Sequence, residues 1–513
     1  MKKTFLVLSL LYAVCLNAQT TTLSLSKKFS LKDPGSTLFG AVMGAGDFYY
    51  SMVVDYKGMQ FAYSATLNKI KYSIEIHKYD EDMKEVKKIS LPGHGKDLGP
   101  FPPAVRLFHG KICVFYYKVL EDNTTKLSFS TIDPNTLTEM DSKDLYTFSD
   151  KNVGLFRMGD VIGNNSLLLE LSPDKTQLLV AQSGNTKEVF TCCVDSNLAV
   201  QKPKVSKIKN IDGFQLEAGC LDNAGNLYFS FLSKSQDLKR RGLWLRNNKD
   251  EESFVNIKTG PGSLLVNKLS LKMARDKSQV YVFADYGQDN LAEGVLLTTV
   301  DKLQHETGNA QLIPYPEEIK AKLKEAGFTQ KFSNGFSVYP ASYKYTELED
   351  GTVVLTGFPE YNVSNQVGNN GSVTMTTYRA GPVINVFTKE GKSRFDLIFR
   401  NQPRDEASSF IALPYQDKFV CIYTDFRKNA YPEGAGKIDR PRELVLTQAT
   451  WGADGTLLGK KEVAARPDGG LTYFINNATP MSDHSWWMPL GRNRVNMVRY
   501  YTEIEQWATL EVK

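Results

Sequence analysis

Long apolar runs are scarce in this 513-residue sequence, and the first one is short. It extends from Phe5 to Leu16, after Lys2 and Lys3, and falls well below the ~20 apolar residues that a membrane helix requires. A basic start, a short apolar run and a small-residue pattern ending at Ala18 are typical of a secretory signal peptide. We therefore expect a leader at 1–18, cleaved after Ala18, no transmembrane segment, and a secreted or periplasmic mature protein.

A lipid anchor is the alternative use of this leader, because Cys15 lies inside it. Lipoprotein signals place a small residue directly before the acylated cysteine. Val14 occupies that position here, so the sequence favours ordinary cleavage over acylation.

Cysteine is also scarce, and removal of the leader leaves an odd number that excludes complete pairing. The remaining residues are Cys113, Cys192, Cys193, Cys220 and Cys421. They lie in apolar, strand-like runs, where a cysteine usually behaves as a small buried hydrophobic residue. Adjacent cysteines in a strand point to opposite faces, which argues against a metal shared by that pair.

Catalytic and cofactor motifs are missing as well. The five histidines are scattered without HxH or HxxxH pairs, and no GxSxG, GxxxxGK or CxxC motif occurs. We therefore predict no metal and no cofactor. Basic and acidic residues number 62 and 57 and are spread along the chain, so the sequence predicts no nucleic-acid partner.

What the sequence does contain is a recurring unit of four strand-like runs. The turn between the third and fourth runs places an Asp, or Lys-Glu-Gly, directly after an apolar strand end, as a hairpin requires. Turns between the first and second runs keep the same register. The third-to-fourth turns lie in HKYDEDMKEV from His77, STIDPNTLTE from Ser130, CCVDSNLAVQ from Cys192, TTVDKLQHET from Thr298, VFTKEGKSRF from Val386 and TWGADGTLLG from Thr450.

In this register the chain resembles β-propeller repeat proteins. The units begin near residues 46, 103, 152, 213, 263, 341, 408 and 483, a spacing in and above the range of propeller blades. The resemblance implies an all-β fold of about eight four-stranded blades, forming one domain over 19–513. It concerns the blade pattern alone, so no family's binding or catalytic residues are carried over. Tandem β-sandwiches are the alternative, but no Pro-, Gly- or Ser-rich linker separates such domains.

The end of the sequence predicts how the ring closes. From Ser485 to Lys513 we expect three strands, Trp486–Leu490, Val495–Tyr501 and Gln506–Val512, one fewer than in the other units. The alternating segment Thr21–Lys32 supplies the fourth, so the first strand of the mature chain pairs with the last blade and removes the free edges. The single clear helix is predicted over 316–327, between the fifth and sixth units.

Three unusual segments are expected on one face of the ring, where loops join second to third strands and one blade to the next. They are 358–381, 425–443 and the entry to the eighth unit from Met481. Long loops on a rigid scaffold commonly carry binding residues. The predicted ligand-binding residues are Tyr361, Tyr378, Arg379, Asp425, Arg427, Tyr431, Asp439, Arg440, Asp483, His484, Trp486 and Trp487.

These aromatic, acidic and Arg side chains suit a glycan, a peptide or another extracellular protein, so we expect a binding and interaction module. A polysaccharide hydrolase or lyase is the first alternative, and a structural scaffold is the second. Glycoside cleavage requires two carboxylates roughly 5 to 10 Å apart. The candidate carboxylates are Glu360, Asp425, Glu433, Asp439 and Asp483.

The leader gives the first testable prediction. When the full chain is expressed in a host with a secretory pathway, we expect the exported protein to begin at Gln19 in N-terminal sequencing. A chain that keeps residues 1–18, or one that carries an acyl group on Cys15, would contradict the assignment.

Overall fold

A computed structural model describes the chain from residue 21 to 513 except for several short segments and loops. Outside the described residues lie 1–20, 27, 29–35, 38–41, 46–47, 58–70, 81–83, 92–103, 120–123, 149–166, 184–187, 208–213, 235–238, 256, 258–264, 267–268, 289–290, 302–306, 309, 326–338, 341–343, 358, 368–371, 380–381, 389–391, 398–401, 404–409, 427–443, 466–470, 474, 476–477, 483 and 496–499.

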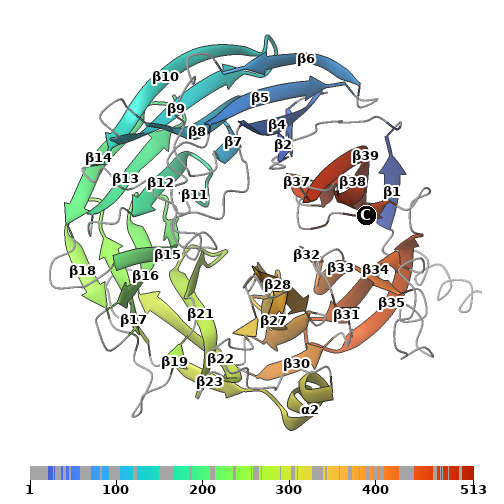
Figure 1. The fold of residues 1–513 in the computed structure, drawn as a ribbon. Coiled ribbons are helices and arrows are strands. Elements are labelled where there is room, and N and C mark those ends of the chain that lie inside the picture. The colour runs from blue at the N-terminus through green and yellow to red at the C-terminus, as the bar shows by residue number, and fades with distance from the viewer. Residues whose placement is uncertain are drawn as a thin grey trace, which may run out of the picture.

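Nine antiparallel sheets are described, and eight of them are blades arranged around a central channel (Figure 1). Each blade has four strand positions from the channel outward, and in blades one, five and eight the innermost position holds two short strands. This arrangement is an eight-bladed β-propeller, as the repeat pattern predicts.

In the first four blades the strands succeed one another from the channel outward. Blade one has β2 (Ser36–Thr37) with β3 (Val42–Ala45), β4 (Phe48–Lys57), β5 (Lys71–Tyr79) and β6 (Glu85–Ser90). Blade two has β7 (Ala104–Phe108), β8 (Lys111–Val119), β9 (Thr125–Asp133) and β10 (Thr138–Thr147). Blade three has β11 (Leu168–Leu171), β12 (Gln177–Ser183), β13 (Glu188–Asp195) and β14 (Val200–Lys207). Blade four has β15 (Phe214–Leu221), β16 (Leu227–Lys234), β17 (Lys239–Arg246) and β18 (Glu252–Val255).

The other four blades follow the same order. Blade five has β19 (Leu265–Val266) with β20 (Ser270–Met273), β21 (Gln279–Gln288), β22 (Leu291–Asp301) and β23 (Gln311–Pro314). Blade six has β25 (Lys344–Glu347), β26 (Val353–Gly357), β29 (Val383–Phe387) and β30 (Ser393–Leu397). Blade seven has β32 (Phe410–Tyr415), β33 (Lys418–Phe426), β34 (Leu444–Gly452) and β35 (Leu457–Ala464). Blade eight has β36 (Thr472–Tyr473) with β37 (Thr479–Ser482), β38 (Ser485–Val495), β39 (Tyr500–Val512) and β1 (Thr21–Leu25).

The predicted Asp turns form because the carboxylate replaces missing backbone partners. Asp133 Oδ1 accepts the backbone N–H groups of Asn135 and Thr136 at 2.8 and 3.0 Å, which fixes the turn between β9 and β10. The turn before β8 instead uses His109 and Gly110, both with positive φ, as a two-residue hairpin of the right twist requires.

Each pair of neighbouring blades encloses its own apolar cluster. Seven such clusters occupy the seams from blades one and two through blades seven and eight. The five cysteines of the described chain are buried and are not joined in disulfides, as predicted. Cys192 belongs to the seam of blades two and three and Cys193 to that of blades three and four, which confirms that they point to opposite faces.

The closing seam, between blades eight and one, is aromatic. Trp487 stacks on Trp507 at 4.2 Å and on Tyr49 of blade one at 4.8 Å, and the Tyr79 ring meets it edge-on at 6.4 Å. Aromatic pairs in these geometries stabilise beyond their buried area. Trp487 is therefore the residue through which the last blade holds the first.

The predicted pairing of the first strand with the last blade is confirmed. β1 lies antiparallel to β39, with Leu23 opposite Leu510, and both strands lie side by side in Figure 1. Ser26 extends the pairing, because its N–H donates to the carbonyl of Trp507 at 2.9 Å and its hydroxyl accepts the Trp507 N–H at 3.0 Å. Thr21 also donates to the side chain of Gln448 in blade seven.

The predicted strand allocation inside blade eight is wrong. Instead of three strands after Trp486, the chain forms two long ones, and the first strand position is filled by β36 and β37. The pattern favours a turn at Gly491, but this residue lies inside β38 at a register shift, a bulge that glycine also favours. Trp486 and Trp487 consequently lie on the second strand and not the first. The N-terminal strand is also shorter than the predicted Thr21–Lys32.

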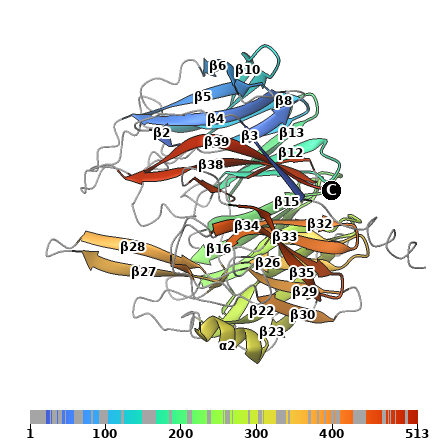
Figure 2. The ribbon, with the colours of Figure 1, turned by 90° about the vertical axis from the view of Figure 1, so that its right-hand side faces the viewer.

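Two elements decorate the ring. The predicted helix is present as α2 (Glu317–Glu325), and Ile319 packs it against the seam of blades five and six. A ninth sheet consists of β24 (Tyr339–Pro340), β27 (Pro359–Val367), β28 (Ser372–Arg379) and β31 (Gln402–Pro403). Its hairpin β27–β28 interrupts blade six between β26 and β29 and projects from one face of the ring (Figure 2). We call this side the loop-bearing face and the opposite side the turn face.

The closing seam gives the second prediction. Trp487→Ala removes a completely buried indole, so it should lower the free energy of unfolding by about 3–5 kcal/mol and lower the thermal midpoint. Leu458→Ala, at a side chain that is 56% exposed, is the control and should change the midpoint little. Equal midpoints for Trp487→Ala and the unmodified protein in thermal denaturation would contradict the role of this seam.

Candidate functional site

The predicted loop residues lie in different environments. Asp425 is completely buried near the end of β33, and Trp487 and Trp486 belong to the core, with 0% and 8% exposure. His484 is exposed beside β38, where its ring meets that of Tyr415 edge-on at 5.8 Å. Predicted site residues outside the described part of the chain are Arg427, Tyr431, Glu433, Asp439, Arg440 and Asp483.

The hairpin holds the remaining four predicted positions in two cross-strand pairs. Tyr361 is opposite Tyr378, and Glu360 is opposite Arg379. Both pairs lie at the end of β27–β28 that joins blade six.

A group of polar residues lies between blades six and seven. We define the six–seven site as Lys344, Thr356, Tyr423, Asp425 and Thr447. Lys344 is paired with Thr356 across β25 and β26, and Tyr423 is paired with Thr447 across β33 and β34. Strand alternation places these residues on the two blade faces that meet at this seam, because Val354 and Cys421 on the same faces form its apolar cluster.

The chain direction puts the six–seven site at the loop-bearing end. Thr356 is the penultimate residue of β26 and Asp425 the penultimate residue of β33, and each strand leads into one of the long insertions. Thr447 lies in the first half of β34, just after the second insertion. The site therefore combines the bases of the two segments in which the sequence predicts ligand binding.

Two hydroxyls of the site are desolvated. Thr356 and Thr447 are both 0% exposed, and their Oγ1 atoms have no hydrogen-bond partner among the residues that the structure describes. A buried polar group without a partner costs about 1–3 kcal/mol. Sites of this kind are exceptions in folded proteins and are frequently explained by function.

Lys344 belongs to the same site. Its Nζ donates to the carbonyl oxygen of Phe410 at 2.6 Å and lies 4.6 Å from the centroid of the Phe410 ring. Burial lowers the pKa of the Lys344 ammonium, although part of the residue is open to solvent. The Lys344 ammonium is therefore the cationic group of the six–seven site.

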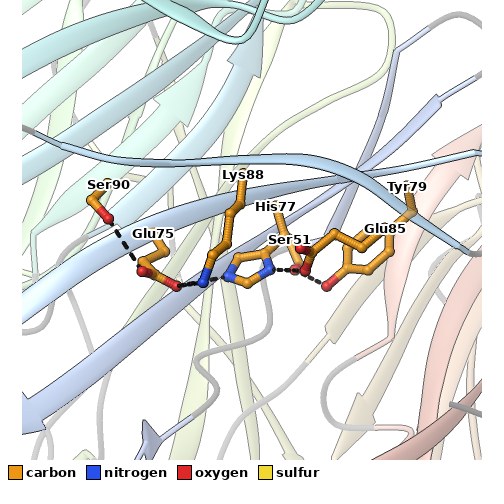
Figure 3. Close-up of polar contacts among 7 residues, drawn as sticks. All are labelled: Ser51, Glu75, His77, Tyr79, Glu85, Lys88 and Ser90. Carbon is orange, nitrogen blue, oxygen red and sulfur yellow. Dashed lines mark hydrogen bonds and ion pairs between the residues drawn. The ribbon is translucent and has the colours of Figure 1, made fainter. Parts of the chain in front are cut away.

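A second polar group lies on the face of blade one that meets blade eight (Figure 3). His77 is 6% exposed, and its Nδ1 lies 2.6 Å from Glu85 Oε2 while its Nε2 lies 3.1 Å from Glu75 Oε2. The hydroxyl of Ser51 is 3.2 Å from that of Tyr79, whose ring also contacts Trp487. This group continues the closing seam outward and fixes its geometry.

Glu75 receives most of the contacts in this second group. Burial favours its neutral form, but the bonds from Lys88 at 3.3 Å and from Ser90 at 3.1 Å, together with His77, outweigh that effect and lower its pKa. Among the described residues, no group of three or more His, Cys, Asp or Glu side chains is arranged to hold a metal ion.

No family model matches the chain, and no curated protein matches it. Among solved structures, the chain is similar to the β-propeller domain of the Trilobed protease from Pyrococcus furiosus, with 11% identity, coverage of 85% of this chain and 99% of that one, and a TM-score of 0.36. It is also similar to the BP39L lectin from Burkholderia pseudomallei, with 11% identity, 87% and 99% coverage, and a TM-score of 0.38.

A third similar structure is the acylaminoacyl peptidase from Pyrococcus horikoshii, with 11% identity and a TM-score of 0.34. The match covers 91% of this chain and 62% of that peptidase. At these identities the similarity concerns the fold alone. The sheet topology of the chain itself defines its class, an eight-bladed β-propeller.

Sequence reasoning missed Lys344, Thr356 and Thr447. Their sequence signal was available, since each lies within a few residues of a strand end that borders a blade junction or a long insertion. What the sequence could not show is that adjacent blades bring these strand ends together.

The second group gives the third prediction. Glu75 has a lowered folded-state pKa, so its stabilisation is present above the unfolded-state pKa and is lost as pH falls through the folded value. Glu75→Gln should therefore lower the thermal midpoint at pH 7, and the difference from the unmodified protein should shrink in acid below pH ~4.

The matched control is Glu349→Gln, at a side chain that is 69% exposed and lies 3.9 Å from Arg275. It should leave the midpoint nearly unchanged at both pH values. A destabilisation by Glu75→Gln that is equal at pH 7 and in acid would contradict the electrostatic account.

Proposed function

We propose that this β-propeller is a binding module whose ligand enters the six–seven site from the loop-bearing face. The observation that carries the proposal is the pair of buried hydroxyls, Thr356 and Thr447, at the bases of both long insertions. Loops on a rigid scaffold are a common location for binding. A ligand that hydrogen-bonds both hydroxyls would recover the free energy that their burial costs.

The chemistry of the site favours an uncharged or zwitterionic polar ligand. Lys344 supplies a cationic donor, Asp425 a carboxylate, and the two threonines supply hydroxyls that both donate and accept. A glycan or a peptide segment presents donors and acceptors of this kind. We therefore infer a glycan or peptide ligand.

Binding is better supported than glycoside cleavage. Cleavage requires two carboxylates facing one pocket. Of the carboxylates that the sequence offers for this purpose, Asp425 is the one whose side chain the structure describes, and it is completely buried. Two buried hydroxyls and a single described carboxylate fit recognition of a ligand.

We also propose that the protein acts outside the cytoplasm. The support is the leader pattern of residues 1–18, which lie outside the described residues. Among the described segments, none is a helix of the length and hydropathy that crossing a bilayer requires.

The fourth prediction tests the proposed site. The exported chain is screened on glycan and peptide arrays, and the affinity of the best ligand is measured by titration calorimetry. Thr356→Val and Thr447→Val keep the side-chain shape and remove the hydroxyl, so each should weaken binding about tenfold, the effect of ~1.4 kcal/mol. The thermal midpoint of the free protein should stay the same or rise, because an unsatisfied group is lost.

Thr191→Val is the matched control, because Thr191 in blade three is also completely buried with no partner for its Oγ1 among the described residues. It should leave affinity unchanged. Full affinity in both seam variants, equal weakening by Thr191→Val, or no ligand on either array would reject the proposal.

A further inference from the structure

Three charged residues occupy the same level of the innermost strands. We call Arg106, Glu170 and Lys272 the channel triad. On β7, β11 and β20 they pair with Cys113, Leu179 and Tyr281, each the third residue of the second strand of its blade. They are therefore related by the rotation of the ring, and they come from blades two, three and five.

In blades four, six and seven no exposed residue occupies this level. Counted in the same way, the corresponding residues of blades four, six and seven are Gly219, Tyr345 and Leu413, of which Gly219 and Leu413 are buried and Tyr345 is half-buried. The three members of the triad are exposed. Since the innermost strands of a propeller border its channel, exposed side chains at this level reach the channel water.

The pKa of Glu170 is affected by both other members of the triad. It is open to solvent, yet the surrounding protein desolvates it and raises its pKa, while the charges of Lys272 and Arg106 act in the opposite direction. A side chain that is both accessible and partly desolvated lies in a concave space. Both cations are near enough to influence the carboxyl across that space.

The members of the triad do not form ion pairs with one another in the described part of the chain. Within the described chain, Glu170 forms no salt bridge, and Arg106 makes one hydrogen bond, from Nη1 to the carbonyl oxygen of Val105 at 3.3 Å. The cationic groups therefore keep most of their donors for another partner. A water-filled, protein-lined channel also strengthens their field on an anion relative to open solvent.

We propose that the channel triad binds the carboxylate of an acidic saccharide, such as a uronate residue. The guanidinium of Arg106 and the ammonium of Lys272 would hold the two carboxylate oxygens by charge-assisted hydrogen bonds. Glu170 would accept a hydrogen bond from a sugar hydroxyl beside the carboxylate. The site has no covalent step and is separate from the six–seven site.

The presence of Glu170 distinguishes an acidic sugar from an acidic peptide. A uronate places hydroxyl donors next to its carboxylate, so one residue satisfies both cations and the glutamate. The side chain of Asp or Glu in a peptide has no donor at that position, so no hydrogen bond would offset the repulsion between its carboxylate and an ionised Glu170. The channel triad lies near the turn face, whereas the six–seven site lies at the loop-bearing end. An experiment can therefore reject binding at one site while binding at the other stands.

The test uses the full exported chain and a galacturonate trimer as probe, with a galactose trimer as its neutral counterpart. We expect binding of the galacturonate trimer in calorimetry, an affinity that falls as salt rises, and at least a tenfold loss in Arg106→Gln and in Lys272→Met. Glu170→Gln should weaken the galacturonate trimer less than either cation variant does.

Arg275→Gln and Lys143→Met, at exposed residues outside the channel triad, are the matched controls and should bind as the unmodified protein does. The triad side chains are exposed, so thermal midpoints should be preserved, and if Arg106→Gln fails to fold, Lys272→Met decides the outcome. The proposal is overturned if the galacturonate trimer does not bind, if the galactose trimer binds equally, if the cation variants bind normally, or if a glutamate trimer binds as tightly.

Discussion

The pairing of β1 with β39 is the constraint on which the rest of the molecule depends. A blade has two faces, and in a ring every face must be covered by a neighbour. Seven seams are covered by consecutive blades, but the eighth exists only if the two ends of the chain meet. The aromatic stack around Trp487 then covers the last pair of faces, and no strand edge is left between the ends.

Closure of the ring gives its two faces different roles. Short Asp and Gly turns on the turn face keep the strands of each blade in register, so positions such as Arg106, Glu170 and Lys272 fall at one level. The loop-bearing face receives the connections that can vary in length without disturbing a seam. Blades six and seven use this freedom for their long insertions, and the seam below them is where buried polar residues replace apolar ones.

The sequence predicted the features that repeat and missed those that do not. Turn residues at fixed offsets revealed eight blades, and the alternating pattern near Thr21 predicted closure, because hairpin chemistry is local. The strand boundaries of blade eight were predicted incorrectly because Gly491 favours a turn and a bulge equally well. Pairing of β38 with β39 decides between the two.

The candidate sites were harder to predict than the fold. Asp425 is predicted from its place before an insertion, but Thr356 and Thr447, which face the same seam, belong to strands that adjacent blades bring together. The channel triad is likewise invisible in the sequence, because its members are related by the rotation between blades two, three and five. The sequence could not show that Trp486 and Trp487, which it predicts as ligand-binding residues, lie in the core, because an aromatic pair beside a loop has the same pattern as an aromatic pair in a seam.

The most direct test of the closed ring is a disulfide between its two ends. Ser24 of β1 lies opposite Thr509 of β39, and residues directly opposite each other in an antiparallel pair are close enough for a disulfide. Under mild oxidation, the double variant Ser24→Cys and Thr509→Cys should form an intramolecular bond in the monomer, because the five native cysteines are buried. Failure to cross-link, or cross-linking only between two chains, would contradict closure of the ring within one molecule.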